Sequence, residues 1–433
     1  MNKNFFALLL SALLLLGTLV GCGGGSGENS PASKPNEPSE NTSAEKVDLR
    51  YAIWNADQAP ALQTIIDEFE AENKDIHVEL EVVQFDQYWV KLEAGASGSS
   101  LPDVFWMNAP NFQKYASNDI LMDLSGVEGI DFSNYADSLV ELYTYEGKNY
   151  GVPKDYDTIG LWYNKEIFDN AGVPYPDQTW TWEKVVEAAQ QLNDPANNIY
   201  GFGAPLKDQE GYYNTILAAG GYVISDDAQK SGFDLEETKA GIAFLSDFVN
   251  KYQVSPTLSQ YNENPNMTLF ENGMVAMQFG GSWRQASIAK NELIADKAGV
   301  TYMPIGPSGK NTCVVHGLSN AGAASTKHPA ETKKFLAFLG SERAAEIQAE
   351  TGTVLPAFNG AAEKWVASNE KVNLQVFVDM VESTAPFPAS KDTAVWAAKV
   401  TENLTKVWQG DMSVENACNT IAIEMNAALA AEG

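Results

Sequence analysis

From Val47 onward, segments with a two-residue hydrophobic period alternate with segments of helical period, and this alternation restricts the possible folds more than any other feature. Residues 47–54 and 76–82 carry apolar side chains at every second position, whereas 62–69 and 86–96 have helical spacing. Strands that alternate with helices usually pack as a mainly parallel sheet with right-handed crossovers. The sequence therefore predicts an α/β fold.

The alternation continues to about residue 327, after which the chain is predicted to be helical almost throughout. Asp234 and Glu237 have the spacing of a capping box. Ser282 and Gln285 have it too, which would place Trp283 in the first turn of a helix that follows a strand. Roughly four hundred residues in such elements are too many for one simple core, so two lobes are expected.

The amino terminus has the pattern of an export signal. Lys3 is followed by an apolar run over 5–20, which is short for a membrane span and has no basic cluster after it. The segment Leu19-Val20-Gly21-Cys22 then resembles the lipobox of bacterial lipoproteins, in which the cysteine becomes lipidated after cleavage. We therefore expect a lipoprotein signal peptide at 1–21, followed by the lipidated Cys22 and a Gly- and Ser-rich flexible linker over 22–46.

Composition excludes several functions. The net charge of −29 comes from 57 acidic against 28 basic residues, and such a surface repels nucleic acid and anionic lipid. The three histidines are scattered and no CxxC or HExxH motif occurs, so no metal site is expected. In an exported protein Cys313 and Cys418 could form a disulfide, or they could be two buried free thiols, and the sequence leaves both open.

Large aromatic and polar side chains follow several predicted strands where ligands usually bind in open α/β sheets. Trp54, Trp106 and Trp283 lie at these strand exits. The nearby polar residues are Asn55, Asp57, Asn108, Asp155, Asp157 and Arg284. Indole rings suit the apolar face of a sugar, while carboxylate, amide and guanidinium groups form paired hydrogen bonds to hydroxyls. The pattern indicates a site for neutral carbohydrate.

Structural roles fit some of these residues as well. Trp106 could fill the space between sheet and helix, Asp157 could cap a turn, and Arg284 could pair with a structural carboxylate. Asp155 and Asp157 could also be imagined as the carboxylate pair of a glycoside hydrolase. Because no nucleophile motif, no Cys/His pairing and no phosphate-binding loop accompanies them, we expect a binding protein rather than an enzyme, with no cofactor.

Several motifs, in order over almost the whole mature chain, resemble family 1 extracellular solute-binding proteins of ABC importers. The motifs are Leu101-Pro102-Asp103-Val104-Phe105-Trp106, Leu161-Trp162-Tyr163-Asn164-Lys165, Phe270-Glu271-Asn272-Gly273-Met274 with Gly281-Ser282-Trp283, and Ser325-Thr326-Lys327-His328-Pro329. The resemblance implies a two-lobe periplasmic-binding-protein-like fold with a hinge and an interlobe cleft. It implies a first lobe of 47–156 plus 303–326 and a second lobe of 157–302 plus 327–433.

The maltose-binding members of that family offer a finer comparison. Their acidic sugar contact on the first crossing segment falls on Asp157, and their strand-exit tryptophans fall on the three already described. A late helical tryptophan that stacks on sugar falls on Trp396, and an aromatic contact falls near Tyr213. The sequence departs from them at Ala109-Pro110-Asn111, where those proteins have an acidic-basic pair. Only the sugar class, not maltose itself, is therefore implied.

The resemblance predicts a monomeric carbohydrate-binding lipoprotein on the outer face of the cell membrane. It would deliver a mono- or oligosaccharide to ABC permease subunits by cleft closure, without an ATP site of its own. Arg284 keeps a phosphorylated polyol open as an alternative ligand, and a polyamine is a further alternative. A sensor-coupled surface lipoprotein without a transport role is the remaining hypothesis.

Overall fold

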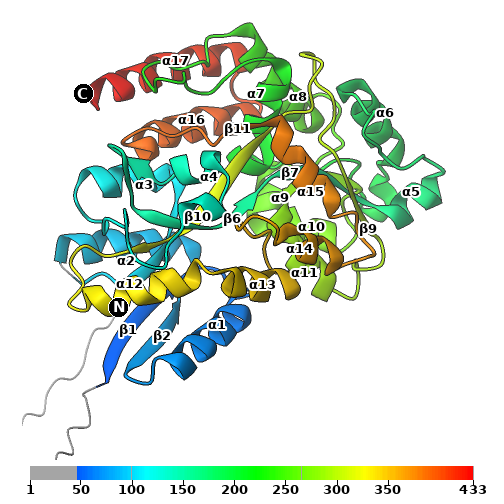
Figure 1. Ribbon diagram of the computed structural model, residues 1–433. Helices are drawn as coiled ribbons and strands as arrows, with labels where there is room; N and C mark the ends of the chain where they lie inside the picture. Colours follow the sequence, from blue (N-terminus) through cyan, green and yellow to red (C-terminus); the bar gives the residue numbers. More distant parts are fainter. Residues whose placement is uncertain (1–45, 99, 265, 433) are drawn as a thin grey trace, which may run out of the picture. The chain divides into compact units, whose positions relative to one another are not determined.

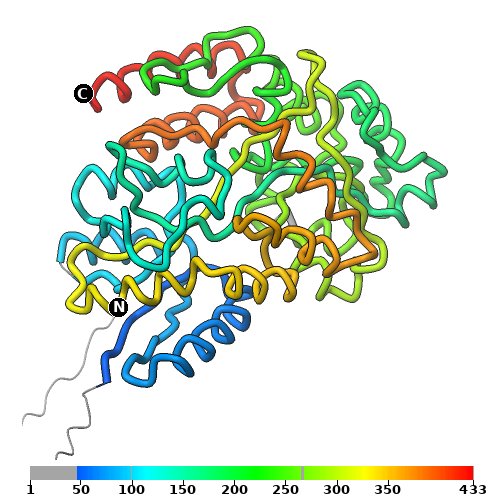
Figure 2. The backbone as a smooth tube through the Cα atoms, viewed as in Figure 1, coloured from blue at the N-terminus to red at the C-terminus, as the bar shows by residue number. Residues whose placement is uncertain are grey.

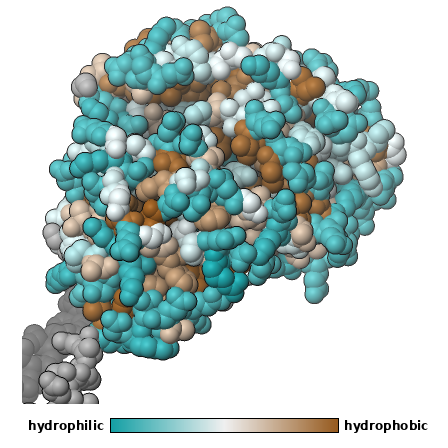
Figure 3. All heavy atoms as spheres, in the orientation of Figure 1, coloured by the Kyte–Doolittle hydropathy of each residue, from teal (hydrophilic) through white to brown (hydrophobic). Residues whose placement is uncertain are grey.

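The computed structural model describes residues 46–98, 100–264 and 266–432. Cys22 and the expected signal peptide and linker lie outside these residues. Figure 1 shows the helices and strands, and Figure 2 the path of the backbone. On the face drawn in Figure 3, hydrophilic residues cover most of the surface and hydrophobic ones form small groups between them. In the described part of the chain, no helix combines the length and the hydropathy that crossing a membrane requires.

Two sheets organise the fold. The larger sheet has the order β11-β10-β3-β1-β2, and β6 pairs with β10 on the side opposite β3. Its strands are β1 (Val47–Ile53), β2 (Ile76–Val82), β3 (Val104–Asn108), β6 (Gly151–Asp157), β10 (Cys313–Gly322) and β11 (Thr384–Pro386). The smaller sheet, of order β8-β7-β9, contains β7 (Ile159–Asn164), β8 (Met277–Gly281) and β9 (Ala298–Thr301). A hairpin joins β4 (Thr144–Tyr145) to β5 (Lys148–Asn149).

The expectation of a mainly parallel sheet holds for the amino-terminal part and for the β10–β11 pair, but not for the other pairings. β1 runs parallel to both β2 and β3, as strand–helix alternation predicts. β10 runs antiparallel to β3 and β6, and β7 runs antiparallel to both of its neighbours. The reason is topological: each of these pairs joins strands from distant parts of the chain, so no single crossover helix sets their direction.

Helices cover the sheets. They are α1 (Ala59–Glu72), α2 (Phe85–Gly98), α3 (Ala109–Ser117), α4 (Asp137–Glu141), α5 (Lys165–Ala171), α6 (Trp182–Leu192), α7 (Tyr213–Ala219), α8 (Glu236–Asn250), α9 (Leu258–Glu263), α10 (Asn266–Glu271), α11 (Gln285–Lys290), α12 (Pro329–Leu339), α13 (Glu342–Glu350), α14 (Ala362–Ala367), α15 (Gln375–Asp379), α16 (Thr393–Trp408) and α17 (Val414–Ala431). Their apolar faces follow the helical spacing: in α1, Leu62, Ile65, Ile66 and Phe69 are all buried.

Two large hydrophobic cores lie on either side of a pair of connecting strands. The first core is built on β1, β2 and β3, and the second on β7, β8 and the late helices α16 and α17. A third, smaller core includes Trp162, whose side chain leaves β7 on the face opposite Leu161 of the second core. β10 contributes Cys313 to the second core and Leu318 to the first, so this strand passes from one core to the other.

Helices α12 and α13 pack in the first core, on the other side of the expected lobe boundary. The sequence prediction placed everything after Lys327 in the second lobe, yet Phe335, Leu336 and Ile347 belong to the first core. Figure 1 shows α12 and α13, in yellow and gold, beside the blue β1, β2 and α1. The apolar faces of these helices complete the cover of the first sheet, which sequence order alone did not indicate.

Local expectations were met in part. The helix predicted at 234–252 is α8, but its N-cap is Leu235 and no side chain caps it, so the predicted capping box is wrong. Ser282 and Gln285 do not form one either: Ser282 starts a 3-10 turn (Ser282–Arg284) that leads into α11, and its hydroxyl bonds elsewhere. Cys313 and Cys418 are free and buried, which decides between the two alternatives left open.

Candidate functional site

The candidate site begins at an irregularity in β6. The ladder between β6 and β10 pairs Pro153 with Ser319 and Asp155 with Leu318, so Lys154 has no partner across the ladder. In a regular strand, neighbouring side chains point to opposite faces. The extra residue of a bulge changes this direction, and it lets Lys154 and Asp155 form an ion pair although they are adjacent in sequence.

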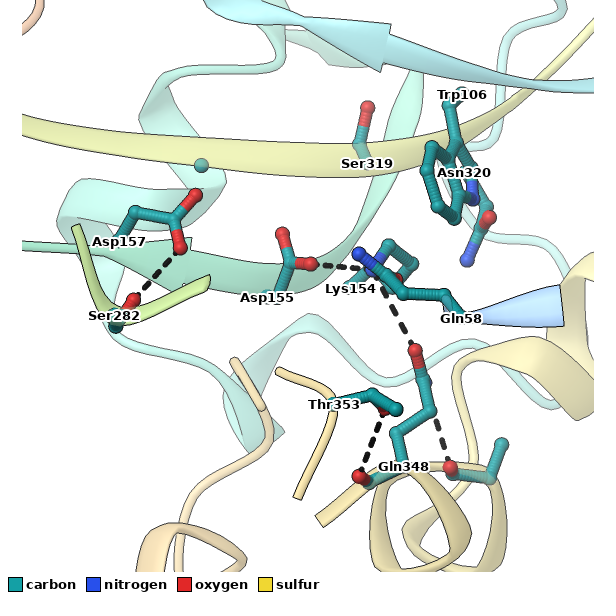
Figure 4. Close-up of polar contacts among 12 residues, drawn as sticks. Gln58, Trp106, Lys154, Asp155, Asp157, Ser282, Ser319, Asn320, Gln348 and Thr353 are labelled. Carbon is teal, nitrogen blue, oxygen red and sulfur yellow. Dashed lines mark hydrogen bonds and ion pairs between the residues drawn. The ribbon is translucent and has the colours of Figure 1, made fainter. Parts of the chain in front are cut away.

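This ion pair lies inside the protein, with side-chain exposures of 0% for Lys154 and 2% for Asp155. The ammonium group also donates to Gln58 Oε1 at the start of α1, at 2.8 Å, and more weakly to Gln348 Oε1 of α13, at 3.5 Å. It lies 4.5 Å from the ring centroid of Trp106. Figure 4 shows Gln58 and Gln348 converging on the lysine from the side opposite Asp155.

Asp157 lies two residues further along β6, on the same face as Asp155. Its Oδ1 accepts a 2.8 Å hydrogen bond from the hydroxyl of Ser282, and the residue is 8% exposed. Burial, reinforced by the charge of Asp155, raises the pKa of Asp157 to about 8. Burial also raises the pKa of Asp155, although Lys154 opposes that shift. The carboxyl group of Asp157 can therefore both accept and donate hydrogen bonds near neutral pH.

His316 lies directly opposite Asp157 in the ladder. Residues paired in this way project from the same face of the sheet with their Cβ atoms about 5 Å apart. The ring packs edge-on against Phe387 with a centroid distance of 5.1 Å. Burial lowers the pKa of His316 to about 4, so at neutral pH its ring is uncharged and offers one donor and one acceptor.

Gly281, Trp283 and Arg284 belong to the segment whose Ser282 contacts Asp157. The indole of Trp283 covers Gly281 so closely that a Cβ atom there would meet ring carbon Cζ3 at 1.9 Å, so the ring requires a glycine. Arg284 is engaged by Glu210: its Nε donates to Oε1 at 2.6 Å, and its Nη2 forms a second bond to Oε2. The guanidinium carbon lies 5.8 Å from the Trp283 ring centroid. In this bidentate pair, the Nε and Nη2 edge of the guanidinium already has both of its hydrogen-bond acceptors within the protein.

Trp54 and Asp57 lie in the segment between β1 and α1. Trp54 is partly exposed and contacts four other aromatic rings, among them Trp106 at 4.9 Å and Tyr88 at 4.9 Å. Asp57 is half-exposed, and its carboxylate forms a 3.0 Å ion pair with Lys290 at the end of α11. Since α11 follows the turn that carries Trp283, this ion pair joins that segment to the segment between β1 and α1.

Three predicted site residues are placed as core residues. Trp106 and Trp396 have no exposed surface, and Tyr213 is 1% exposed. Their polar atoms or ring edges are already used: Trp106 Nε1 donates to Tyr51, Trp396 Nε1 donates to Ser390, and Tyr213 packs against Tyr212 and Phe387. Their contact with a ligand stays a prediction, since a helical or strand-end position in the sequence does not say which face of the ring is covered.

The structure thus brings together Asp157 and the Trp283–Arg284 turn, with Trp54 and Asp57 at the edge. Sequence reasoning missed Lys154, Glu210, Ser282 and His316 as members of the site. A charged pair within an otherwise buried strand was a usable signal for Lys154, but Glu210 lies in a polar loop that carried none. Within the described ranges, His, Cys, Asp and Glu side chains form no group that could hold a metal ion.

A cavity of about 280 Å³ lies elsewhere, lined by residues of β1, β2 and α2 such as Arg50, Glu81 and Lys91. Those residues do not belong to the polar cluster on β6. Within the cluster, carboxyl, amide and ammonium groups bond mainly to one another. This arrangement, two cores joined by crossing strands with paired polar groups between them, is the construction of a two-lobe solute-binding protein.

Comparison with known proteins gives the family. Residues 64–373 match the family of bacterial extracellular solute-binding proteins, and the chain belongs to it. The chain is 24% identical, over 270 residues, to a Brucella abortus (strain 2308) protein described only as a binding protein; the match covers 61% of the chain and spans 65% of that relative's length. It is also 24% identical over 402 residues to the maltodextrin-binding protein MdxE of Bacillus subtilis (strain 168), with 91% of the chain and 90% of MdxE covered.

Solved structures agree on the fold. The ABC substrate-binding protein Lmo0181 from Listeria monocytogenes, in complex with cycloalternan, superimposes with a TM-score of 0.84 at 24% identity. That alignment covers 89% of this chain and 99% of Lmo0181. The predicted two-lobe α/β fold and the predicted family are confirmed.

Proposed function

We propose that the protein binds a carbohydrate between its two lobes and delivers it to an ABC importer. The observation that carries the proposal is the buried contact of Asp157 with Ser282, which places a carboxyl group of the crossing strand beside the Trp283–Arg284 turn. A carboxyl group next to a partly exposed indole ring is the combination that recognises the hydroxyls and the apolar face of a sugar. The maltodextrin named for MdxE supports the same class of ligand.

Each site residue has a proposed role. Asp157, Ser282 and His316 would hydrogen-bond sugar hydroxyls, because together they offer several donors and acceptors at one place. Trp283 and Trp54 would stack on the ring faces. Trp106, Tyr213 and Trp396 would support this surface from beneath, since they are buried.

Closure would be the binding mechanism. Asp57 and Arg284 would contribute at the rim, and the Asp57–Lys290 ion pair would form when the walls meet. A ligand that contacts both walls binds the closed form more tightly, and it shifts the equilibrium only by that difference in affinity. We propose a first lobe that includes 47–156 and also α12 and α13, because these helices pack in the first core. The second lobe would include 157–302 and the chain after α13.

The alternative of a phosphorylated polyol loses support from the geometry of Arg284. Its guanidinium already makes a bidentate pair with Glu210, so a phosphate would have to displace a buried carboxylate. We propose further that Cys22 anchors the protein by lipid on the extracytoplasmic side of the membrane. Replacement by Ser should move the protein from the membrane fraction to the medium or periplasm, and unchanged membrane association would refute the anchor.

Isothermal titration calorimetry of the purified chain lacking residues 1–45 tests the ligand class. The panel contains glucose, maltose, maltotetraose, cellobiose and lactose, with glycerol 3-phosphate and spermidine for the alternatives. We expect at least one sugar to bind, and Asp157→Ala and Trp283→Ala each to weaken that binding at least tenfold while the variants stay folded. Binding of glycerol 3-phosphate or spermidine alone would refute the sugar assignment. Permease genes beside the gene for this protein would favour transport, whereas a sensor-kinase gene in that place would favour a sensor role.

A further inference from the structure

Exposed hydrophobic side chains are concentrated at one place in the described part of the chain. Among the described residues, seven large hydrophobic side chains are exposed. Three of these seven lie between the end of β2 and the middle of α2, namely Val82, Phe85 and Val90. Phe85 is 48% exposed. Single exposed apolar residues are ordinary, but a group of them, particularly with an aromatic ring, marks a surface that binds something.

The Phe85 ring belongs to a continuous aromatic surface. It meets Trp54 edge-to-face with a centroid distance of 5.6 Å, and Trp89 at 6.4 Å. The ring centroids of Trp54 and Trp89 are 5.7 Å apart, so each of the three rings contacts the other two. We call these three residues the aromatic shelf. Trp54 and Trp89 are both partly exposed, so the shelf offers ring surface to an incoming molecule rather than serving only as core.

Polar atoms beneath the shelf lack partners. Among the described residues, the indole nitrogen of Trp89 and the hydroxyl of Tyr115 are buried without a hydrogen bond, and their rings are 6.4 Å apart. Tyr115 is 2% exposed. Buried polar atoms in folded proteins nearly always have a partner, so two neighbouring exceptions indicate that something hydrogen-bonding normally completes this region.

The surroundings of the shelf identify the chemistry of its occupant. The neighbouring exposed side chains are Gln84, Asp86 and Gln87, which are amides and a carboxylate. Such groups form paired hydrogen bonds to hydroxyls, which is the chemistry that a sugar lying on aromatic rings requires. The shelf also continues the candidate site, because Trp54 is followed within three residues by Asp57, which is paired with Lys290 of α11.

We propose that the aromatic shelf binds an additional hexose unit, and that the ligand is therefore an oligosaccharide that reaches from the buried carboxyl groups out to α2. The proposal rests on the proposed function and extends it from a sugar to a sugar chain. One ring of the chain would contact the Trp283 wall, and a later ring would place its C–H face on Phe85 and Trp54. Stacking of this kind depends on a flat ring, so Tyr can replace Phe85 but Ala cannot.

Calorimetry with sugars of increasing length tests the inference, with glucose, maltose, maltotriose and maltotetraose as one series and glucose, cellobiose, cellotriose and cellotetraose as the other. We expect wild-type affinity to rise with length in one series. Phe85→Ala should weaken the longest ligand of that series about tenfold and leave the shortest one that binds unchanged. Phe85→Tyr should keep the wild-type affinity.

Ile423→Ala is the matched control, because Ile423 is 73% exposed on α17 and lies outside the group of exposed residues around the aromatic shelf. It should change neither affinity nor melting temperature. Equal binding of glucose and the longest sugar, or a Phe85→Ala variant that behaves like Ile423→Ala, overturns the aromatic shelf and leaves the proposed function standing. A wild-type protein that binds no sugar of either series overturns both.

Discussion

The buried pair of Lys154 and Asp155 gives a sharp test of the site's construction. Replacing Lys154 by Met removes an ammonium group that is fully buried and bonds to Asp155 and to Gln58 Oε1. The carboxylate of Asp155 would then be left buried and unpaired, which costs ~3–5 kcal/mol of unfolding free energy. Burial already raises the pKa of Asp155, so part of that loss returns when its carboxylate takes up a proton.

The double variant Lys154→Met with Asp155→Asn separates charge from packing. It removes both charges and leaves mainly the unpaired oxygen of Gln58, which costs ~1–3 kcal/mol. The two substitutions together should therefore be less destabilising than Lys154→Met alone, by about 2 kcal/mol. Urea unfolding followed by circular dichroism measures both values, provided that the slope with denaturant stays constant.

An exposed ion pair provides the control. Lys371 and Asp296 are only 2.5 Å apart, but their side chains are 64% and 78% exposed. Lys371→Met should leave the urea midpoint unchanged, because solvent and salt screen such a pair. The reasoning is refuted if Lys154→Met shifts the midpoint no more than Lys371→Met does, or if the double variant is as unstable as the single one.

Three further predictions concern the same region. Because the pKa of Asp157 is raised to about 8, the folded protein keeps a proton that the unfolded chain has released. The unfolding free energy should therefore fall between pH 6.5 and 8 by up to ~1.4 kcal/mol per pH unit. Asp157→Asn should remove this slope, and urea unfolding measured at a series of pH values tests it. Gly281→Ala would place a Cβ atom 1.9 Å from the Trp283 ring, so it should lower stability by ~1–3 kcal/mol and shift tryptophan emission, whereas an unchanged spectrum would contradict the described ring position. Cys313 and Cys418, whose thiol pKa values burial raises to about 12, should not react with Ellman's reagent until the protein is unfolded, and rapid labelling of the native protein would show that they are accessible.

The lower pH limit in the first of these predictions has a physical reason. Burial lowers the pKa of His316 to about 4, so between about pH 4 and 6.5 the unfolded chain binds a proton there that the folded protein does not. That effect raises stability with pH and opposes the effect of Asp157. Above pH 6.5 the opposing effect of His316 fades, which is why the slope should be measured there.

The sequence predicted the features that depend on near neighbours along the chain. The two-residue period gave β1 and β2, and the helical period gave α1. Glycines before Trp283 marked the end of a strand, and the turn that carries Trp283 and Arg284 does follow β8. Such local patterns are visible in sequence because side-chain direction repeats with a fixed period in each element.

Contacts between distant parts of the chain were decided only by the tertiary structure. Glu210 and Arg284 are 74 residues apart, and Asp157 and Ser282 are 125 apart, so no local pattern could pair them. The bulge that turns Lys154 toward Asp155 depends on the register with β10.

The solvent exposure of a side chain was likewise decided only by the tertiary structure. Trp396 and Phe85 are both large aromatic residues in helices, yet one is fully buried and the other is 48% exposed. Periodicity determines which elements form, because each residue restricts its neighbours. Packing alone determines which surfaces of those elements stay open to a ligand, because burial depends on atoms that the chain brings in from far away.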